Sequence, residues 1–316
     1  MTPKLVNDWR DLPAALRGAS VALGNFDGLH HGHAAVVQAA LDWGPRHDAK
    51  VGVISFEPHP RRYFQPDASP FRVMSPDQQA RALGAMGVDV LYLLAFDSHM
   101  AGLSDLEFAQ CVLRDGLGVR HVAVGFDVTF GKDRSGDGAT LKRYGQSLGF
   151  EVTVVERLAD VEGIKYASSE ARKALARGEP EAAAAMLGRP FSIEGAVVKG
   201  DQRGRLLGFP TANIELADYV RPALGVYAVR VTLPDGRRVP GVANIGRRPT
   251  VGGADERLEA HLFDFDEDLY GKRLEVELVS MIRAEQKFES LDALRARITR
   301  DAAEARLRLD KPAGGV

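Results

Sequence analysis

Residues 24–33, GNFDGLHHGH, constrain the fold of this chain more than any other segment. They directly follow the apolar run VAL at 21–23 and precede AAVVQAAL at 34–41, so a strand, a glycine-bearing turn and a helix start come in succession. Open α/β sheets build phosphate sites in this way, because backbone N–H groups and the helix dipole point at the anion. The spacing H-x-G-H lets His30 and His33 add two donors facing the same place.

Length and composition bound the class of protein. A chain of 316 residues favours two domains, and 45% hydrophobic with 27% charged residues is typical of a soluble globular protein. With a net charge of −2, the chain as a whole has no positive electrostatic potential to attract a polyanion, so we expect no nucleic-acid partner. The single cysteine, Cys111, excludes a disulfide or a thiolate metal site within one chain.

The sequence carries no targeting or membrane pattern. The N-terminus lacks a signal-peptide pattern, and the longest apolar run, at 90–96, is too short to span a bilayer. We therefore expect a cytoplasmic protein with no membrane partner. Whether the chain forms a homo-oligomer cannot be read from the sequence.

The first half alternates apolar runs with helical patterns. The runs lie at 21–23, 50–56, 88–94, 121–125 and 151–155, and the helical patterns at 33–43, 76–86, 104–117 and 139–148. This alternation is typical of βαβ units and predicts a Rossmann-like parallel sheet with helices.

The second half is predicted to be antiparallel β. After residue 190 short strands follow one another, separated by turns such as PDG at 234–236. One long helix with Ser290 as its N-cap closes the chain. Ala-rich helices broken at Gly178 and Pro180 join the halves. We place the boundary between domains of residues 1–183 and 184–316.

The histidine turn has two structural alternatives to a phosphate site. One is a surface turn with incidental histidines, and the other is a metal site, for which only Asp27 is near. The interpretation we favour is that His30 and His33 contact the α- and β-phosphates of a nucleoside triphosphate and stabilise charge during attack at the α-phosphorus. Gly24, Phe26 and Asp27 are predicted to help bind the same nucleotide. His31 is unassigned and expected to face solvent.

Three further segments of the first half are candidates for ligand binding. Phe56 and His59 in FEPHP follow the second predicted strand and can line a flat aromatic ligand, although the segment can also be a proline-shaped connection. Asp127 in GFDVTFG can accept from a polar ring edge or be a simple turn residue. Ser168 and Arg172 are four apart at a helix start, where both can reach one phosphate, but SSEAR is also an ordinary helix N-terminus.

The densest motif of the second half is GDQRGRLLGFPTAN at 200–213. Its glycines let the backbone approach a ligand or turn sharply. If the chain is extended here, the side chains of Thr211 and Asn213 face the same side. Their hydroxyl and amide oxygens suit Mg²⁺ bound to a phosphate chain. The alternative is a structural one, a β-bulge with a Thr–Asn turn. Glu259 alternates with Leu258 and Ala260; it is either a solvated strand residue or the base that deprotonates an alcohol.

The first-half motifs resemble a known family. The H-x-G-H turn, FEPHP, GFDVTFG and ASSEAR together look like the FMN adenylyltransferase module of the bacterial bifunctional riboflavin kinase/FMN adenylyltransferases. The resemblance implies that His30 and His33 bind ATP phosphates, and that Asp127, Ser168 and Arg172 serve flavin and nucleotide binding.

The chain departs from that family at several positions. Aligned on the arginine, Ala167 stands where the family has Ser, and Ser169 and Ala171 where it has Thr and Ile. Val128 and Thr129 replace the common Phe and Arg. These departures affect the details of the adenylyltransferase site.

The second half resembles riboflavin kinase over its whole length, through GRPF, GRLLGFPTAN, GVYAV, NIGRRPT, LEAHLFDFDEDLYG and IRAEQKF. The resemblance implies a six-stranded closed antiparallel barrel with a C-terminal helix, Thr211 and Asn213 holding Mg²⁺-ATP, and Glu259 as catalytic base. The residues expected to bind nucleotide or flavin in this half are Gly200, Gly204, Arg205, Gly208, Pro210, Thr211, Asn213 and Arg283.

Together the two resemblances imply an enzyme that phosphorylates riboflavin with ATP to FMN and adenylylates FMN with a second ATP to FAD and pyrophosphate. The substrates are small molecules, with Mg²⁺ accompanying ATP. Two alternatives stay open. Another adenylyl- or cytidylyltransferase shares H-x-G-H but leaves residues 188–288 unexplained. A flavin-binding regulator without catalysis is favoured only by the departures at Ala167 and Val128.

Overall fold

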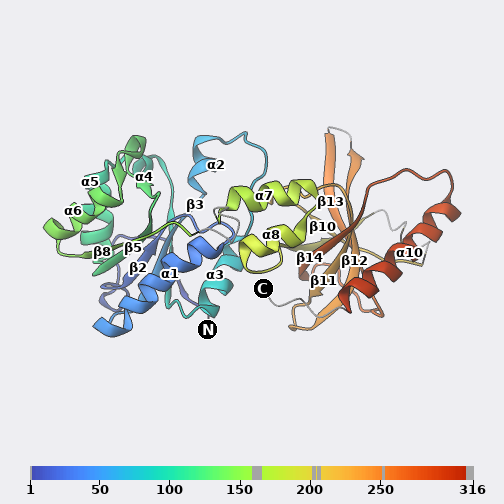
Figure 1. The fold of residues 1–316 in the computed structure, drawn as a ribbon, viewed down its shortest axis with the longest axis horizontal. Helices are drawn as coiled ribbons and strands as arrows, with labels where there is room; N and C mark the ends of the chain where they lie inside the picture. The colour runs from blue at the N-terminus through green and yellow to red at the C-terminus, as the bar shows by residue number, and fades with distance from the viewer. Residues whose placement is uncertain (1, 159–165, 201–203, 205–207, 251–252, 311–316) are drawn as a thin grey trace. The chain divides into compact units, whose positions relative to one another are not determined.

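The structure is a computed structural model of the 316-residue chain and describes residues 2–158, 166–200, 204, 208–250 and 253–310. It contains two compact units (Figure 1). One comprises Met1–Ala68 and Pro76–Tyr166, and the other Ser69–Ser75 and Ala167–Val316.

The first unit is built on a six-stranded parallel sheet in the order β1-β4-β3-β2-β5-β8. Its strands are β1 (Lys4–Val6), β2 (Ser20–Leu23), β3 (Val51–Glu57), β4 (Val90–Ala95), β5 (His121–Gly125) and β8 (Glu151–Val155). The predicted parallel sheet is confirmed. The sequence pattern does not indicate the edge strand β1, because it has three residues of which two are exposed and so shows no alternation.

Helices lie at the four segments predicted from the sequence, and two further short helices lie at residues 60–64 and 98–102. They are α1 (His31–Trp43), α2 (Pro60–Phe64), α3 (Pro76–Ala85), α4 (Ser98–Gly102), α5 (Asp105–Glu107), the π-helix η3 (Phe108–Gly116) and α6 (Gly138–Leu148). Short 3₁₀ turns lie at η1 (Ala14–Leu16), η2 (Pro45–His47) and η4 (Lys132–Arg134), and a hairpin pairs β6 (Thr129–Phe130) with β7 (Gly136–Asp137). The helix expected at 104–117 begins with a capping box of Ser104 and Glu107 and continues as the π-helix.

The strand order reverses between β2 and β5. From β2 the chain passes to β3 on one side, and after β4 it returns to β5 on the other side. The loops that follow β2 and β5 therefore leave in opposite directions, which is where open α/β sheets bind ligands. The histidine turn follows β2, and residues 126–128 follow β5.

The second unit is a closed barrel in the order β10-β13-β12-β11-β14-β9, with every neighbouring pair antiparallel. Its strands are β9 (Ser192–Val198), β10 (Ala212–Glu215), β11 (Gly225–Thr232), β12 (Arg238–Thr250), β13 (Gly253–Leu262) and β14 (Arg273–Ala284). Helix α10 (Leu291–Leu309) packs on the outside against β11, β12 and β14 (Figure 1). The predicted six-stranded barrel with a closing helix is confirmed.

Two short helices and one distant segment belong to the barrel unit. α7 (Ser168–Arg177) and α8 (Pro180–Leu187) contribute Ala171, Leu175 and Leu187 to the barrel core. Arg72, from the first half of the sequence, donates its N–H to the Asp218 carbonyl at 3.0 Å and accepts from Val220 N at 2.8 Å. The compact unit thus begins before the predicted domain boundary at 183/184, because composition alone does not reveal which core an Ala-rich helix joins.

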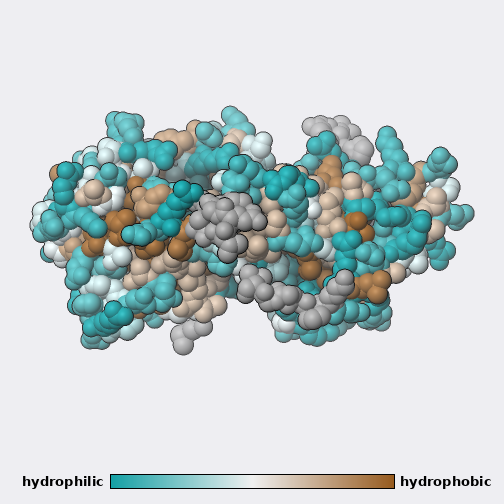
Figure 2. All heavy atoms as spheres, in the orientation of Figure 1, coloured by the Kyte–Doolittle hydropathy of each residue, from teal (hydrophilic) through white to brown (hydrophobic). Residues whose placement is uncertain are grey.

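On the face drawn in Figure 2, hydrophilic residues cover most of the molecule and hydrophobic ones gather in separate patches. Among the described residues, no helix is both long and apolar enough to cross a membrane.

Candidate active sites

The histidine turn is held by its backbone conformation and by two buried apolar side chains. Phe26, Gly28 and Leu29 have φ values of 49°, 84° and 42°, which fold the chain back sharply after β2. Phe26 and Leu29 are 1% and 3% exposed, so they anchor the turn in the sheet unit. The segment therefore reaches α1 in a fixed conformation, as a preformed phosphate site requires.

His30 and His33 lie together at the N-terminus of α1. His30 is the N-cap: its Nδ1 accepts from the backbone N–H of His33 at 3.3 Å. The two imidazole rings stack with centroids 3.7 Å apart and planes 20° from parallel, and the Phe26 ring lies 5.1 Å from that of His33. Two imidazoles are thus gathered where the helix dipole favours an anion, as the sequence predicts.

The neighbours of these histidines are also packed. Asp27 is 8% exposed, and a Cβ built on Gly24 would lie 3.3 Å from the Phe26 ring. His31 is half-buried and meets the Tyr166 ring edge-on at 4.7 Å. The expectation that His31 faces solvent is wrong, because Tyr166, distant in sequence, packs against it.

Phe56 and His59 have structural contacts at the end of β3. Phe56 packs against Phe96 and Phe108, with ring centroids 5.7 and 6.4 Å away. His59 caps α2, its Nδ1 accepting from the Arg61 N–H at 3.0 Å, and follows a cis Glu57–Pro58 bond. A ligand-lining role for Phe56 and His59 stays a prediction.

Asp127 lies across the strand-order reversal from the histidine turn. It is exposed in a turn after β5 that is closed by the Val128 N–H to the Gly125 carbonyl at 3.1 Å. At the two positions that depart from the family pattern, Val128 packs against the core and Thr129 accepts from Arg134 Nε at 3.0 Å.

Ser168 and Arg172 belong to the barrel unit. They lie in the first turns of α7, whose N-cap Ala167 provides no side-chain hydrogen bond. Arg172 Nε donates to the Phe71 carbonyl at 2.6 Å, and its guanidinium lies 5.5 Å from the Phe71 ring centroid. The predicted phosphate contacts of Ser168 and Arg172 stay predictions.

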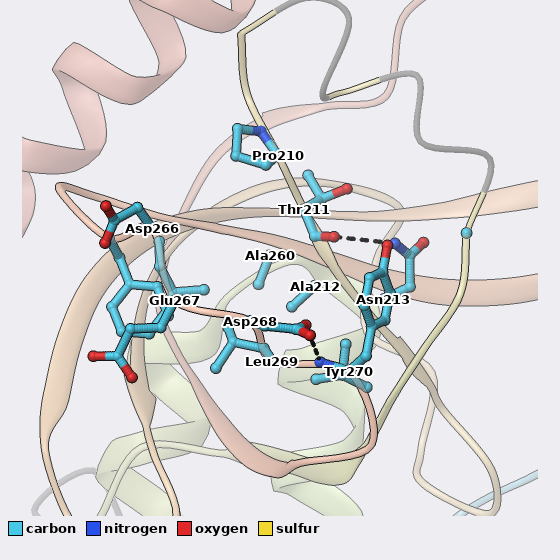
Figure 3. A pocket seen from close by; sticks show the side chains of 14 residues that line it. Pro210, Thr211, Ala212, Asn213, Ala260, Asp266, Glu267, Asp268, Leu269 and Tyr270 are labelled. Atoms are coloured by element: carbon cyan, nitrogen blue, oxygen red, sulfur yellow. Dashed lines mark hydrogen bonds between the residues drawn. The ribbon is translucent and has the colours of Figure 1, made fainter.

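A pocket of about 580 Å³ opens between strands β10 and β13 and the loop after β13 (Figure 3). Thr211 and Asn213 both line it, in agreement with the prediction that they share one side. Asp266 and Asp268 from the loop line it as well. These two acidic residues were not assigned to the site from the sequence, because the run FDFDEDLYG has no metal-ligand spacing that marks them.

Asn213 is held in a close-fitting position. It is 7% exposed, and its Nδ2 donates to the Thr211 carbonyl at 3.3 Å. A Cβ on Gly200 would lie 2.6 Å from both Nδ2 and Oδ1 of Asn213, so only glycine leaves room for this amide. Because Nδ2 is the donating atom, Oδ1 is the atom that suits a hard cation.

The described part of the glycine-rich segment also includes Gly204, Gly208 and Pro210. Gly204 accepts from the Phe209 N–H at 2.8 Å, and a Cβ on it would lie 2.4 Å from the Phe209 carbonyl oxygen. Gly208 has a φ of 84°. The carbonyl oxygen of Pro210 lies 2.9 Å from His261 Nδ1. Arg205 lies outside the described residues.

Glu259 is placed by strand register. It is the direct cross-strand partner of Asn213 on β10 and of Asn244 on β12. Its sequence neighbours Leu258 and Ala260 are buried in the barrel core, so Glu259 points to the outer face, where it is half-buried. The barrel therefore brings the predicted base and the predicted metal ligand Asn213 side by side.

Arg283 has a structural partner. Its Nε and Nη2 lie 2.9 and 2.8 Å from Oδ2 of Asp301, which is 3% exposed on α10 and also lies 2.9 Å from Arg297. The Phe288 ring lies 5.6 Å from the guanidinium. Arg283 thus fastens α10 to β14, and its predicted role in ligand binding stays a prediction.

Comparisons with known proteins agree with this arrangement. A family model described as FAD synthetase matches residues 12–170, and one described as riboflavin kinase matches residues 187–309. A transferase that joins a nucleotidyltransferase sheet to a kinase barrel is the class these matches define.

Whole-length relatives identify the family. The bifunctional riboflavin kinase/FMN adenylyltransferase of Escherichia coli K12 is 41% identical over 313 residues, which cover 98% of this chain and 100% of that protein. Its counterpart in Pseudomonas fluorescens is 42% identical over 304 residues, covering 96% and 97%. The chain belongs to the family of bifunctional riboflavin kinase/FMN adenylyltransferases, with an FAD synthetase domain followed by a riboflavin kinase domain.

A solved structure shares the fold. A crystal structure of a macrolide-efflux protein from Streptococcus pneumoniae has a TM-score of 0.84 and 31% identity, covering 97% of this chain and 99% of that one.

Proposed function

We propose that the two activities use separate sets of residues, one in each unit. In the barrel, the 5′-hydroxyl of riboflavin attacks the γ-phosphorus of ATP, and Glu259 takes the hydroxyl proton as FMN and ADP form. The observation that carries this assignment is the register pairing of Glu259 with Asn213, which sets a carboxylate beside a ligand for the phosphate chain.

The oxygen donors around the pocket suit Mg²⁺. Thr211 and Asn213 supply a hydroxyl and an amide oxygen, and Asp266 and Asp268 add carboxylates from the loop on the same pocket. We propose that Thr211 and Asn213 hold the cation together with ATP oxygens. When bound, Mg²⁺ neutralises charge on the phosphates.

In the sheet unit, we propose that FMN is adenylylated at the histidine turn. A phosphate oxygen of FMN attacks the α-phosphorus of ATP, the bond to the β-phosphate oxygen breaks, and FAD and pyrophosphate result. His30 and His33 stabilise the charge that develops on the α-phosphate and the departing pyrophosphate. Gly24, Phe26 and Asp27 shape the nucleotide pocket, and Asp127 contacts the flavin.

Flavin chromatography tests this assignment. Incubation with riboflavin, ATP and Mg²⁺ is expected to give FMN first and FAD afterwards, both lost when Mg²⁺ is chelated. Asn213→Ala is expected to stop FMN formation from riboflavin while FAD still forms from added FMN. Retention of FMN formation by this variant would remove Asn213 from the kinase site.

A further inference from the structure

Two buried polar side chains contact the start of the histidine turn. Ser55 on β3 is 2% exposed, and Gln79 on α3 is 6% exposed. Burial of a hydroxyl or an amide costs free energy unless its hydrogen bonds are made, so each of these side chains needs a partner in the interior. Both find it in the backbone of Asn25.

The three groups form a closed set of hydrogen bonds. Ser55 Oγ donates to the Asn25 carbonyl oxygen at 3.0 Å, and Gln79 Nε2 donates to the same oxygen at 3.3 Å. Gln79 Nε2 also donates to Ser55 Oγ at 3.3 Å. An amide nitrogen carries two hydrogens, a hydroxyl both donates and accepts, and a carbonyl oxygen has two lone pairs, so each group stays within its capacity. The Asn25 carbonyl is thus held from two elements, β3 and α3.

The Asn25 carbonyl belongs to the peptide unit that leads into Phe26. Phe26 has a φ of 49°, a conformation that costs free energy for a bulky side chain. On the other side of Asn25, the Gly24 N–H donates to the Ile54 carbonyl at 3.2 Å. The peptide plane before the strained residue is therefore fixed by hydrogen bonds on both sides.

Phe26 connects this peptide to the histidines. Its ring is 1% exposed and lies 5.1 Å from the His33 ring, which stacks on the His30 ring at 3.7 Å. Its carbonyl accepts from the Leu29 N–H at 3.2 Å, which closes the turn just before His30. A rotation of the Asn25–Phe26 peptide would therefore move Phe26 and change the packing of the imidazole pair.

We infer that Gln79 and Ser55 are positioning residues for adenylyl transfer. Their shared hydrogen bonds to the Asn25 carbonyl hold the turn in the conformation that directs the imidazole pair at the phosphates. The inference rests on the proposed role of those histidines. Donors that stabilise charge in a transition state must be held in place, so a loosened turn lowers the rate of the chemical step more than it weakens ATP binding.

Kinetics of the full-length enzyme with added FMN and ATP test the inference. Gln79→Met keeps the length of the side chain and removes the donor, and it is expected to lower kcat for FAD formation about tenfold while KM for ATP changes by about twofold or less. Ser55→Ala, a smaller change, is expected to act in the same direction and carries the test if Gln79→Met fails to fold. In a His33→Ala background, with residual FAD formation followed in a single turnover, the loss caused by Gln79→Met should shrink.

Tyr92→Phe is the control that separates positioning from stability. The Tyr92 hydroxyl donates to the Leu16 carbonyl at 2.7 Å and the side chain is 1% exposed, so this variant also removes a buried hydrogen bond to a backbone carbonyl of the sheet unit. Leu16 precedes β2, whereas the histidine turn follows that strand. Tyr92→Phe is therefore expected to lower the unfolding free energy, as Gln79→Met does, with kcat for FAD formation unchanged.

The folding of the sheet unit can be followed by itself. Both tryptophans of the chain, Trp9 and Trp43, belong to this unit, so their fluorescence during urea unfolding measures its stability in each variant. FMN formation from riboflavin is expected to stay at the parental rate in all of these variants, because the kinase residues belong to the barrel unit.

The outcomes separate the inference from the proposed site. Full FAD formation by His33→Ala would overturn the proposed role of the histidines. If His33→Ala loses FAD formation while folded Gln79→Met and Ser55→Ala keep the parental kcat, only the positioning role is overturned. Losses of Gln79→Met and His33→Ala that multiply fully in the double variant, or an equal loss of kcat in Tyr92→Phe, would likewise overturn it.

Discussion

The imidazole rings of His30 and His33 stack 3.7 Å apart, while the Nδ1 of His30 caps the helix that carries His33. His30 therefore combines an observed helix-capping contact with the proposed role in binding phosphate. The cap needs an acceptor at position 30, and the proposed chemistry needs an imidazole there. Substitutions that keep the acceptor and remove the ring distinguish the two.

His30→Asn is expected to lower FAD formation from FMN about 100-fold, because it removes a donor to the developing phosphate charge. Asparagine is a good N-cap, so the unfolding free energy should stay close to that of the parent. His30→Ala, the matched variant, should lose the same activity and also about 1 kcal/mol of stability. Chromatography of flavins and urea unfolding measure the two effects. Equal stability of both variants would contradict the capping role.

Gly200→Ala is expected to impair the kinase alone. Its Cβ would lie 2.6 Å from both polar atoms of the Asn213 amide, so that side chain must move. Displacement of a phosphate-positioning group by about 1 Å can cost about 100-fold in rate. Steady-state FMN formation measures the loss, and Gly102→Ala, where nothing lies within 4 Å of the added Cβ, is the control for an added methyl group. Unchanged FMN formation in Gly200→Ala would show that Asn213 needs no fixed position.

Asp301→Asn is expected to destabilise the barrel unit by about 3 kcal/mol, because it leaves Arg283 and Arg297 beside a neutral group in a buried site. Glu304→Gln is the matched control on the same helix, since the side chains of the Arg308–Glu304 pair are 33% and 44% exposed and loss of the pair should lower the unfolding free energy by less than about 1 kcal/mol. Urea unfolding with FMN formation as the probe compares them. Similar losses in both variants would contradict a helix-fastening role for Asp301.

Acid is expected to destabilise the sheet unit through His121. Burial lowers the pKa of His121 to about 4, and its ring nitrogens lie 2.8 and 2.9 Å from the hydroxyls of Ser20 and Thr153. The unfolded chain therefore binds a proton at higher pH than the folded one. Stability from the neutral ring is complete above pH about 6.5 and declines as the pH falls towards 4.

The unfolding free energy measured between pH 7 and pH 4 checks this dependence. His121→Gln should flatten the curve in that window, whereas His99→Gln, at an exposed position, should leave its shape unchanged. A parental curve that is already flat between pH 6.5 and 4 would contradict the assignment.

Periodicity in the sequence predicts most of the fold because both halves obey simple patterns. Near-continuous apolar runs such as 121–125 identify the buried parallel strands, and alternation around Glu259 identifies a barrel strand. The edge strand β1 is too short to show either pattern. The pairing of Arg72 with residues 218–220 joins positions far apart in the chain, and no local signal announces it.

The sequence predicts the candidate sites only in part, because some of their contacts join residues far apart in the chain. Thr211 and Asn213 stand out because they lie in one dense motif, and both line the pocket. The partnership of Glu259 with Asn213 and Asn244 depends on strand register, which the residues of one strand do not encode. Motif position suggests ligand binding for Arg283, whereas the structure adds a tertiary partner, Asp301.

The central claim is that each unit performs one step with its own residues. The most direct test of this claim mixes two variants, each of which lacks one activity. Glu259→Gln should make no FMN, and His33→Ala should stop at FMN, so neither alone forms FAD from riboflavin, ATP and Mg²⁺. The account predicts that an equimolar mixture of the two restores FAD formation, because FMN released by one variant is adenylylated by the other. Loss of both activities in either folded variant, or a mixture that accumulates FMN without FAD, would contradict it.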